Sequence, residues 1–185
     1  MTTRDVVLVA LFAAIMVVLG LSPRIPLTFL PVPITLQTLG VMLAGTMIGP
    51  IRGALAMLLF LLLIAMGLPV LAGGQGGLGS FAGPTAGFIY GWPIGAFVAG
   101  WAFKAWGQRV PKPWGEIAVI FLACVLGGIV IVYLCGVAWL VLMTGIGLQK
   151  ALIGMVAFVP GDLIKAVLSS LIVHNVRRAY PLDLK

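Results

Sequence analysis

An acidic and a basic residue stand three positions apart inside an apolar run near the C-terminal end of the sequence. Asp162 and Lys165, in the stretch "FVPGDLIK", are the only charged residues from Ala151 to Val173. Residues at positions i and i+3 of a helix share a face, so the two side chains can meet. Ionisable groups inside a membrane are costly and mark a functional site by default. The pair therefore predicts a polar ligand pocket, with a self-contained ion pair that caps a helix as the alternative.

The residues that flank this pair indicate its depth. Proline cannot continue a helix without a break, so Pro160 favours a new helix that begins beside it. Asp162 then lies in the first turn, where free backbone N–H groups favour an anionic group nearby. Arg177 follows Asp162 by about 22 Å of helix. If Arg177 marks the inner membrane surface, Asp162 lies in the outer half of a hydrocarbon core about 30 Å thick.

Three further polar side chains are candidates for the same pocket. Gln37 and Thr38 lie together in "VPITLQTLGVMLAG", and Gln75 lies in a glycine-rich loop. An amide offers both a donor and an acceptor, so it can bind an amide or urea group of a ligand. The alternative for Gln37 and Thr38 is that they hold neighbouring helices together. Tyr90 and Trp92 follow the loop, where an aromatic ring belongs either to the interfacial belt or against a bound ring.

The composition determines which solvent surrounds these residues. Of the 185 residues, 62% are hydrophobic and 8% are charged, whereas a soluble domain has about 25% charged residues. In a soluble protein a net charge of +7 would suggest nucleic-acid binding, but here the basic residues stand between apolar runs, which is typical of membrane topology. We therefore expect a membrane protein that binds no nucleic acid. Cys124 and Cys135 share one apolar run, and their spacing predicts neither a disulfide nor a metal site.

Six apolar segments have the length and composition of membrane-spanning helices, and together they predict a single all-α integral membrane domain over residues 1–185. They are Val6–Leu21, Ile34–Ile48, Gly53–Leu71, Pro84–Phe103, Ile117–Met143 and Ala151–Val173. Six spans place both termini on one side. The positive-inside rule makes that side cytoplasmic, because it would hold eight basic residues and the opposite side only two, Arg24 and Lys150. The eight are Arg4, Arg52, Lys104, Arg109, Lys112, Arg177, Arg178 and Lys185.

The two outer connections that precede the second and fourth spans are rich in glycine and proline and too apolar for solvated linkers. They read "SPRIPLTFLPVP" and "GLPVLAGGQGGLGSFAGPT". We expect both to fold over the bundle as a lid, with a flexible turn as the alternative for the second. Its "GGQGGLG" has no following Lys-Ser/Thr, so it is not a phosphate-binding loop. Uphill transport by this chain would therefore need ion coupling or another protein.

Small residues and one histidine complete the candidates. Ala10 and Ala14 form a small-xxx-small pair that permits close helix contact, within this bundle or with a partner. His174, with Ser169 or Ser170, gives only a weak hydrolase pattern, because these serines would lie inside a helix without an oxyanion site. We expect no enzyme activity, no metal and no cofactor.

At this point the sequence resembles a known family. "PVPITLQTLGVMLAG", "GLPVLAGGQGGLGSFAGPTAGFIYGW" and "VPGDLIKA" resemble, in the same order, the BioY family of biotin-specific S components of energy-coupling-factor transporters. The resemblance implies a six-helix membrane protein with biotin bound near the outer face. The implied biotin contacts are Gln37, Thr38, Gln75, Phe88, Tyr90, Asp162 and Lys165.

The resemblance also implies partners and a location. Ala10 and Ala14 would dock onto a membrane coupling subunit that two ABC-type ATPases drive, in the lipid of a bacterial or archaeal cell membrane. Biotin would be the transported ligand rather than a cofactor. Asp162 suits the ureido N–H donors of biotin, and Lys165 suits either its carboxylate or its ureido carbonyl. The alternatives are a solitary transporter that works without ATPases, a membrane enzyme and a purely structural subunit, and the oligomeric state stays open.

Overall fold

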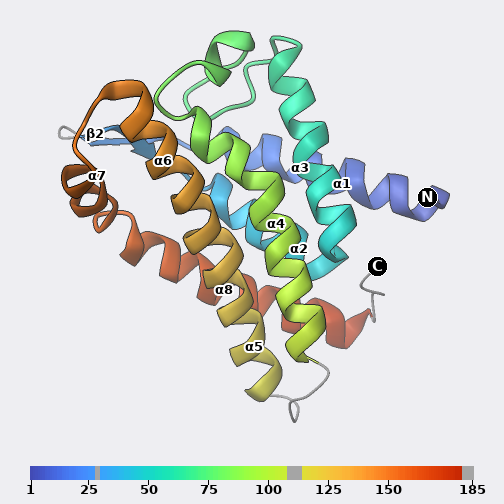
Figure 1. Cartoon of the computed structure of the whole chain (residues 1–185). Coiled ribbons are helices and arrows are strands. Elements are labelled where there is room, and N and C mark those ends of the chain that lie inside the picture. The colour runs from blue at the N-terminus through green and yellow to red at the C-terminus, as the bar shows by residue number, and fades with distance from the viewer. Residues whose placement is uncertain (28–29, 108–113, 181–185) are drawn as a thin grey trace.

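The computed structural model describes residues 1–27, 30–107 and 114–180 of the chain, and in these ranges it is a bundle of helices with one short hairpin (Figure 1). The helices are α1 (Thr3–Gly20), α2 (Gln37–Ile48), α3 (Pro50–Ala65), η1 (Leu78–Phe81), α4 (Ala86–Gly107), α5 (Trp114–Cys124), η2 (Val125–Ile131), α6 (Val132–Thr144), α7 (Leu148–Met155) and α8 (Val159–Ala179). The strands are β1 (Ile25–Leu27) and β2 (Leu30–Ile34), paired antiparallel.

Six apolar helical segments occur in the predicted order. Within the described ranges, α1, α4 and the continuous run α5–η2–α6 are each long and apolar enough to cross a membrane. The bent pair α7–α8 forms a fourth such segment, and α2 and α3 are shorter apolar helices. The all-helical membrane architecture is therefore confirmed. In the sixth segment a 48° bend separates α7 from α8, at the break that Pro160 predicts.

Helix α4 lies at the centre of the bundle and packs against α2, α3, α5, η2 and α6 (Figure 1). Glycines make these close approaches possible. A Cβ atom built on Gly45 of α2 would lie 2.2 Å from the carbonyl oxygen of Ala96, and one on Gly127 of η2 would lie 2.3 Å from that of Gly95. Both distances are far below van der Waals contact with backbone atoms. Glycine at these positions therefore sets the spacing between α4 and its neighbours.

We expect Gly45→Ala to destabilise the bundle, because the added methyl group can fit only if α2 and α4 move apart. Overpacking of a core costs about 1–3 kcal/mol. Thermal unfolding of the purified protein in detergent, followed by tryptophan fluorescence, measures the effect. Gly79→Ala is the matched control, since a Cβ atom there meets nothing within 4 Å. An unchanged unfolding midpoint for Gly45→Ala would contradict this account of the α2–α4 contact.

Both outer loops contain secondary structure in their described residues. The first forms the β1–β2 hairpin, so α2 begins at Gln37 rather than at the predicted Ile34, which pairs with Ile25 in the sheet. The second contains an isolated bridge between Leu71 and Gln75, followed by η1. Gly73 permits the loop to turn, with φ at +81°, and the side chain of Arg24 from the first loop lies against it.

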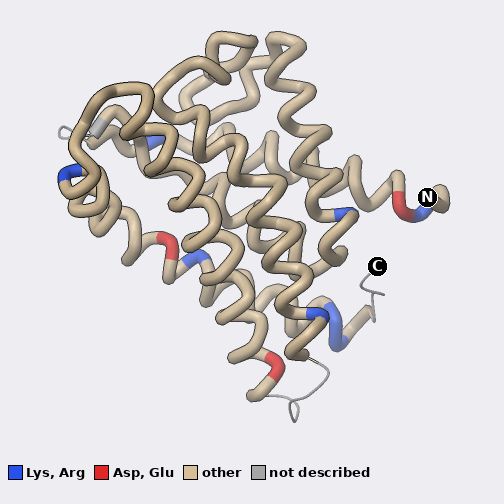
Figure 2. The backbone as a smooth tube through the Cα atoms, viewed as in Figure 1, with Lys and Arg blue, Asp and Glu red and all other residues tan. Residues whose placement is uncertain are grey.

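Charged residues gather at the end of the bundle opposite these loops (Figure 2). Asp5 of α1 forms a buried ion pair with Arg52 of α3. Glu116 of α5 contacts His174 of α8 at 3.1 Å and Arg177 at 3.7 Å. The Arg177 guanidinium also lies 5.1 Å from the ring centre of Phe103 in α4. One ionic cluster therefore joins α1 to α3, and the other joins α4, α5 and α8. Arg109, Lys112 and Lys185, also expected on this side, lie outside the described residues.

Candidate functional site

The predicted acid and base begin a helix. Helix α8 starts at Val159, with Pro160 in its first turn. Proline is well tolerated there, because N–H groups in the first turn of a helix have no intrahelical acceptor and the one that proline lacks is not needed. Asp162 lies in the first turn, as predicted, and it is 3% exposed. Lys165 lies one turn later and is 5% exposed. The break between α7 and α8 therefore directs both charged side chains into the bundle.

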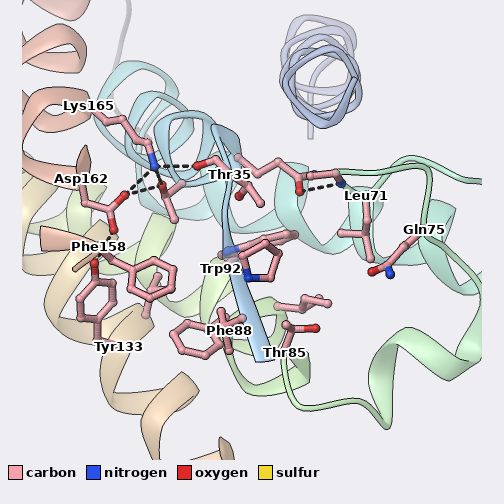
Figure 3. Close-up of a pocket in the computed structure, with 17 residues that line it drawn as sticks. Thr35, Leu71, Gln75, Thr85, Phe88, Trp92, Tyr133, Phe158, Asp162 and Lys165 are labelled. Carbon is pink, nitrogen blue, oxygen red and sulfur yellow. Dashed lines mark hydrogen bonds and ion pairs between the residues drawn. The ribbon is translucent and has the colours of Figure 1, made fainter. Parts of the chain in front are cut away.

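A closed network of hydrogen bonds surrounds this pair (Figure 3). Lys165 Nζ donates to Asp162 Oδ1 at 2.7 Å, to Thr38 Oγ1 at 2.9 Å and to the backbone oxygen of Thr35 at 2.6 Å. Thr38 Oγ1 in turn donates to Asp162 Oδ1 at 2.9 Å. Tyr133 donates from its hydroxyl group to Asp162 Oδ2 at 2.5 Å. The network joins α8 to α2, to the residue after β2 and to α6.

Counting donors and acceptors shows which atoms of this network can still bind a ligand. An ammonium group has three donors, and Lys165 uses all three within the protein. A carboxylate has about four acceptor sites, and Asp162 receives two bonds on Oδ1 and one on Oδ2. The network therefore offers a ligand an acceptor on Asp162 Oδ2, whereas Lys165 holds that carboxylate in place.

Gln37 supports the glycine-rich loop. It is the first residue of α2 and is 2% exposed. Its Oε1 atom accepts a hydrogen bond from the backbone N–H of Ala72 at 3.3 Å, and its Nε2 atom donates to the backbone oxygen of Val70 at 3.4 Å. Gln37 therefore holds the loop that covers the cavity, in addition to lining the cavity as predicted.

A cavity of about 80 Å³ lies between this network and the two outer loops (Figure 3). Both loops contribute to its wall, which confirms the expected lid. Of the side chains expected at the ligand, six line it. The lining residues are Val32, Pro33, Thr35, Gln37, Thr38, Leu71, Ala72, Gln75, Thr85, Phe88, Ile89, Trp92, Val132, Tyr133, Phe158, Asp162 and Lys165.

Tyr90 is the expected ligand residue that does not line the cavity. It is 40% exposed, and its hydroxyl group donates to the backbone oxygen of Phe81 at 2.8 Å. Its ring packs against Phe81 and, edge to face, against Trp139. Two residues on a helix turn the side chain by about 200°, so Phe88 faces the cavity and Tyr90 faces away. In this structure Tyr90 holds η1 against α4.

Sequence reasoning missed Tyr133, and it weighed Trp92 as an interfacial aromatic or as a ring against the ligand without naming it a site residue. Trp92 is 5% exposed and lines the cavity. The sequence did hold a signal for it, because Trp92 follows Phe88 by four residues and therefore shares its helix face. Tyr133 carries no such signal. It meets Asp162 from 29 positions away, after the π-helical segment η2 has changed the register of the helix.

Other chemistry finds no support in the described ranges. No group of three or more His, Cys, Asp or Glu side chains there can hold a metal ion. Cys124 and Cys135 are free thiols, as predicted. Ser170 donates to the backbone oxygen of Val167, and His174 pairs with Glu116, so these two residues do not form a nucleophile–base pair. The cavity has the character of a binding site.

Comparison with known proteins identifies the family. The sequence matches the BioY family over residues 1–182. It is 52% identical over 182 residues to the biotin transporter BioY of Rhizobium etli, covering 98% of this chain and 97% of that one. Identity to the biotin transporter BioY of Rhodobacter capsulatus is 48% over 187 residues, covering 96% of this chain and 95% of that one.

A solved structure has the same fold. The S-component for biotin from an ECF-type ABC transporter superposes with a TM-score of 0.87 at 37% identity, covering 96% of this chain and 95% of that one. The fold, the site and the sequence motifs thus lead to one assignment, and the chain belongs to the BioY family.

Proposed function

We propose that this chain is the biotin-binding S component of an energy-coupling-factor transporter, which captures biotin at the outer face of a cell membrane. The observation that carries the proposal is the cavity beneath two outer loops that ends at the buried Asp162 network. Relatives named biotin transporters match nearly the whole chain, and the matching solved structure is an S-component for biotin. A transporter subunit needs no catalytic residue, and biotin is its cargo rather than a cofactor.

The polar groups of the cavity suit the chemistry of biotin. Biotin has two ureido N–H donors, a ureido carbonyl, an apolar sulfur-containing ring and a carboxylate tail. Asp162 Oδ2 accepts from a ureido N–H, while Lys165, Thr38 and Tyr133 hold the carboxylate of Asp162 in place. Phe88 lines the wall, and its ring lies edge to face with that of Tyr133, so the two rings form an apolar surface for the bicyclic ring.

The carboxylate tail of biotin lies toward the mouth of the cavity. Lys165 has no free donor for it, and burying a charge without a partner is very costly. Gln75 is exposed and lies at the opposite side of the cavity from Asp162 (Figure 3). Its amide can donate to the tail where water also reaches it. Gln37 acts indirectly, because it holds the loop that carries Gln75.

Direct titration tests the proposal. Isothermal calorimetry of the purified protein with biotin, riboflavin, thiamin and pantothenate is expected to show tight saturable binding of biotin alone. The absence of biotin binding by correctly folded protein would refute the proposal. Uptake in liposomes separates the alternatives, because an S component needs the coupling subunit and ATPases for ATP-driven uptake. A solitary transporter would accumulate biotin without them.

The orientation follows from the distribution of charge. Four basic residues lie at the helix ends that are farthest from the outer loops, namely Arg4, Arg52, Lys104 and Arg177. The same end of the bundle holds both ionic clusters. The positive-inside rule places this end in the cytoplasm. Both termini are then cytoplasmic, in the plasma membrane of a bacterium or archaeon, and the cavity opens outward.

Helix α1 supplies the proposed docking site for the coupling subunit. Ala10 and Ala14 are exposed, whereas Ala13 between them is buried in the bundle. Their small side chains therefore leave a shallow stripe on the outer face of α1, against which a partner helix can pack closely. ATPases acting through that subunit supply the energy, since this chain has no phosphate-binding loop.

We expect the double substitution Ala10→Leu and Ala14→Leu to abolish copurification with the coupling subunit and ATP-driven biotin uptake. Biotin affinity of the isolated chain is expected to stay within about twofold, because neither residue lines the cavity. Affinity purification through a tag on the coupling subunit measures the complex. Ala118→Leu is the matched control, as Ala118 is exposed on α5. Normal copurification of the double variant would contradict the docking role.

A further inference from the structure

Most polar groups around the cavity already have partners within the protein. The three donors of Lys165 are used, and Gln37 is bonded to the backbone of the glycine-rich loop. The hydroxyl group of Thr38 both donates and accepts. A ligand that enters the cavity must therefore find its polar contacts among the few remaining groups. Asp162 Oδ2 is one, and it can only accept.

Trp92 carries a buried donor without a partner. Its Nε1 atom is buried and has no hydrogen-bond partner among the described residues. Trp92 belongs to α4, where its ring packs against Phe60 with the ring centres 5.9 Å apart. Figure 3 shows the indole between the Asp162 network on one side and Gln75 on the other, with Phe88 facing it. Trp92 also lines the cavity, so its N–H group belongs to a residue of the cavity wall.

The chemistry of this donor restricts what can satisfy it. An indole N–H donates and cannot accept. Buried tryptophan N–H groups usually have a hydrogen-bond partner, because an unpaired buried donor loses its hydration without compensation. Asp162 lines the same cavity and has the opposite requirement. A ligand that satisfies both groups must present a donor and an acceptor at its buried end.

We propose that Trp92 is a specificity-determining residue whose Nε1–H donates to the ureido carbonyl of biotin while Asp162 accepts from a ureido N–H. This inference rests on the proposed function. The ureido carbonyl is neutral, so a single neutral donor suffices at a buried position. The carboxylate tail is charged and needs more than one neutral donor if it is buried. Trp92 therefore binds the buried end of the ligand, and Gln75 binds the carboxylate tail.

A single-atom replacement tests the role of the N–H group without changing the shape of the ring. Site-specific incorporation of 3-benzothienylalanine at position 92 replaces the indole N–H by sulfur. We expect the Kd for biotin to rise about tenfold, equivalent to about 1.4 kcal/mol. The Kd for 2-thiobiotin, whose C=S group is a weak acceptor, is expected to change less than twofold. The same replacement at Trp101, which is 53% exposed on α4, is the matched control and leaves both constants unchanged.

The outcomes separate this inference from the proposed function. If the unmodified protein does not bind biotin, the proposed function fails. If it binds biotin and the replacement at position 92 changes nothing, or weakens biotin and 2-thiobiotin equally, only the role of Trp92 is overturned. Biotin amide, which lacks the charged tail, completes the comparison. If the effect of the replacement disappears with biotin amide, Trp92 binds the tail, and the ureido assignment is wrong.

If the protein with 3-benzothienylalanine at position 92 does not fold, a measurement on the unmodified protein still tests the role of Trp92. In a sample with ¹⁵N-labelled indole groups, the chain gives one side-chain N–H signal for each of its 5 tryptophans. Formation of a hydrogen bond moves such a proton signal downfield. We expect biotin to shift the Trp92 signal downfield and 2-thiobiotin to shift it less. An unchanged Trp92 signal at saturating biotin would overturn the inference.

Discussion

Replacement of Asp162 by asparagine is expected to weaken biotin binding at least tenfold, equivalent to at least about 1.4 kcal/mol. The substitution keeps the size of the side chain but removes its charge and exchanges one acceptor oxygen for a donor. Oδ2 is the atom that Tyr133 holds at 2.5 Å, and its remaining acceptor site faces the ligand in the proposed binding mode. Calorimetric titration of the purified variant with biotin measures the loss.

The same substitution is expected to lower stability, because Lys165 keeps its charge at 5% exposure and loses its counter-ion. Removal of one partner of a buried ion pair costs about 3–5 kcal/mol in soluble proteins. Asp5→Asn is the matched control. Asp5 forms the buried pair with Arg52 at the end of the bundle opposite the outer loops and does not line the cavity. We therefore expect this control to lose stability while biotin affinity stays within about twofold.

Two results would contradict this account of Asp162. Unchanged biotin affinity in a folded Asp162→Asn variant would show that the ligand does not use this carboxylate. An equal loss of affinity in the Asp5→Asn control would show that general destabilisation, and not the lost acceptor, weakens binding. The comparison needs both proteins at a temperature well below their unfolding midpoints.

The parts of the site that sequence could predict are those with local causes. Pro160 determines where α8 begins, so Asp162 falls in the first turn and Lys165 on the same face. These relations depend only on helix geometry over a few residues. The apolar segments likewise follow from composition, since backbone groups in lipid must pair within helices. For these features the prediction and the structure agree.

The parts that sequence missed depend on contacts between distant segments. Tyr133 on α6 contacts Asp162 on α8, and the π-helical segment η2 before it determines which way the Tyr133 side chain faces. Gln37 braces a loop more than 30 residues further along the chain. No local pattern reports such contacts. The placement of Tyr90 is different, since helical periodicity alone separates it from Phe88, and the prediction considered its residue type without its helix face.

Replacement of Lys165 by methionine is expected to reveal whether the buried pair acts as one unit. Methionine fills a similar volume without charge, so Asp162 would remain as a carboxylate that is 3% exposed and lacks its cation. We expect the free energy of unfolding to fall by about 3–5 kcal/mol, as for other broken buried ion pairs, and the unfolding midpoint to fall with it. We also expect weaker biotin binding, because Asp162 Oδ1 loses its bond from Lys165 and the carboxylate loses its fixed orientation.

The double variant Asp162→Asn/Lys165→Met separates the two effects. It contains no isolated buried charge, and an uncompensated buried charge is what makes each single substitution costly. Its unfolding midpoint is therefore expected to lie above those of both single variants, whereas biotin affinity stays low because the acceptor is still missing. If the stability losses of the single variants simply add, the two residues are not coupled. If the double variant binds biotin normally, the ion pair only holds the helices together. Recovered stability without recovered binding is the result that assigns Asp162 to the ligand and Lys165 to its orientation.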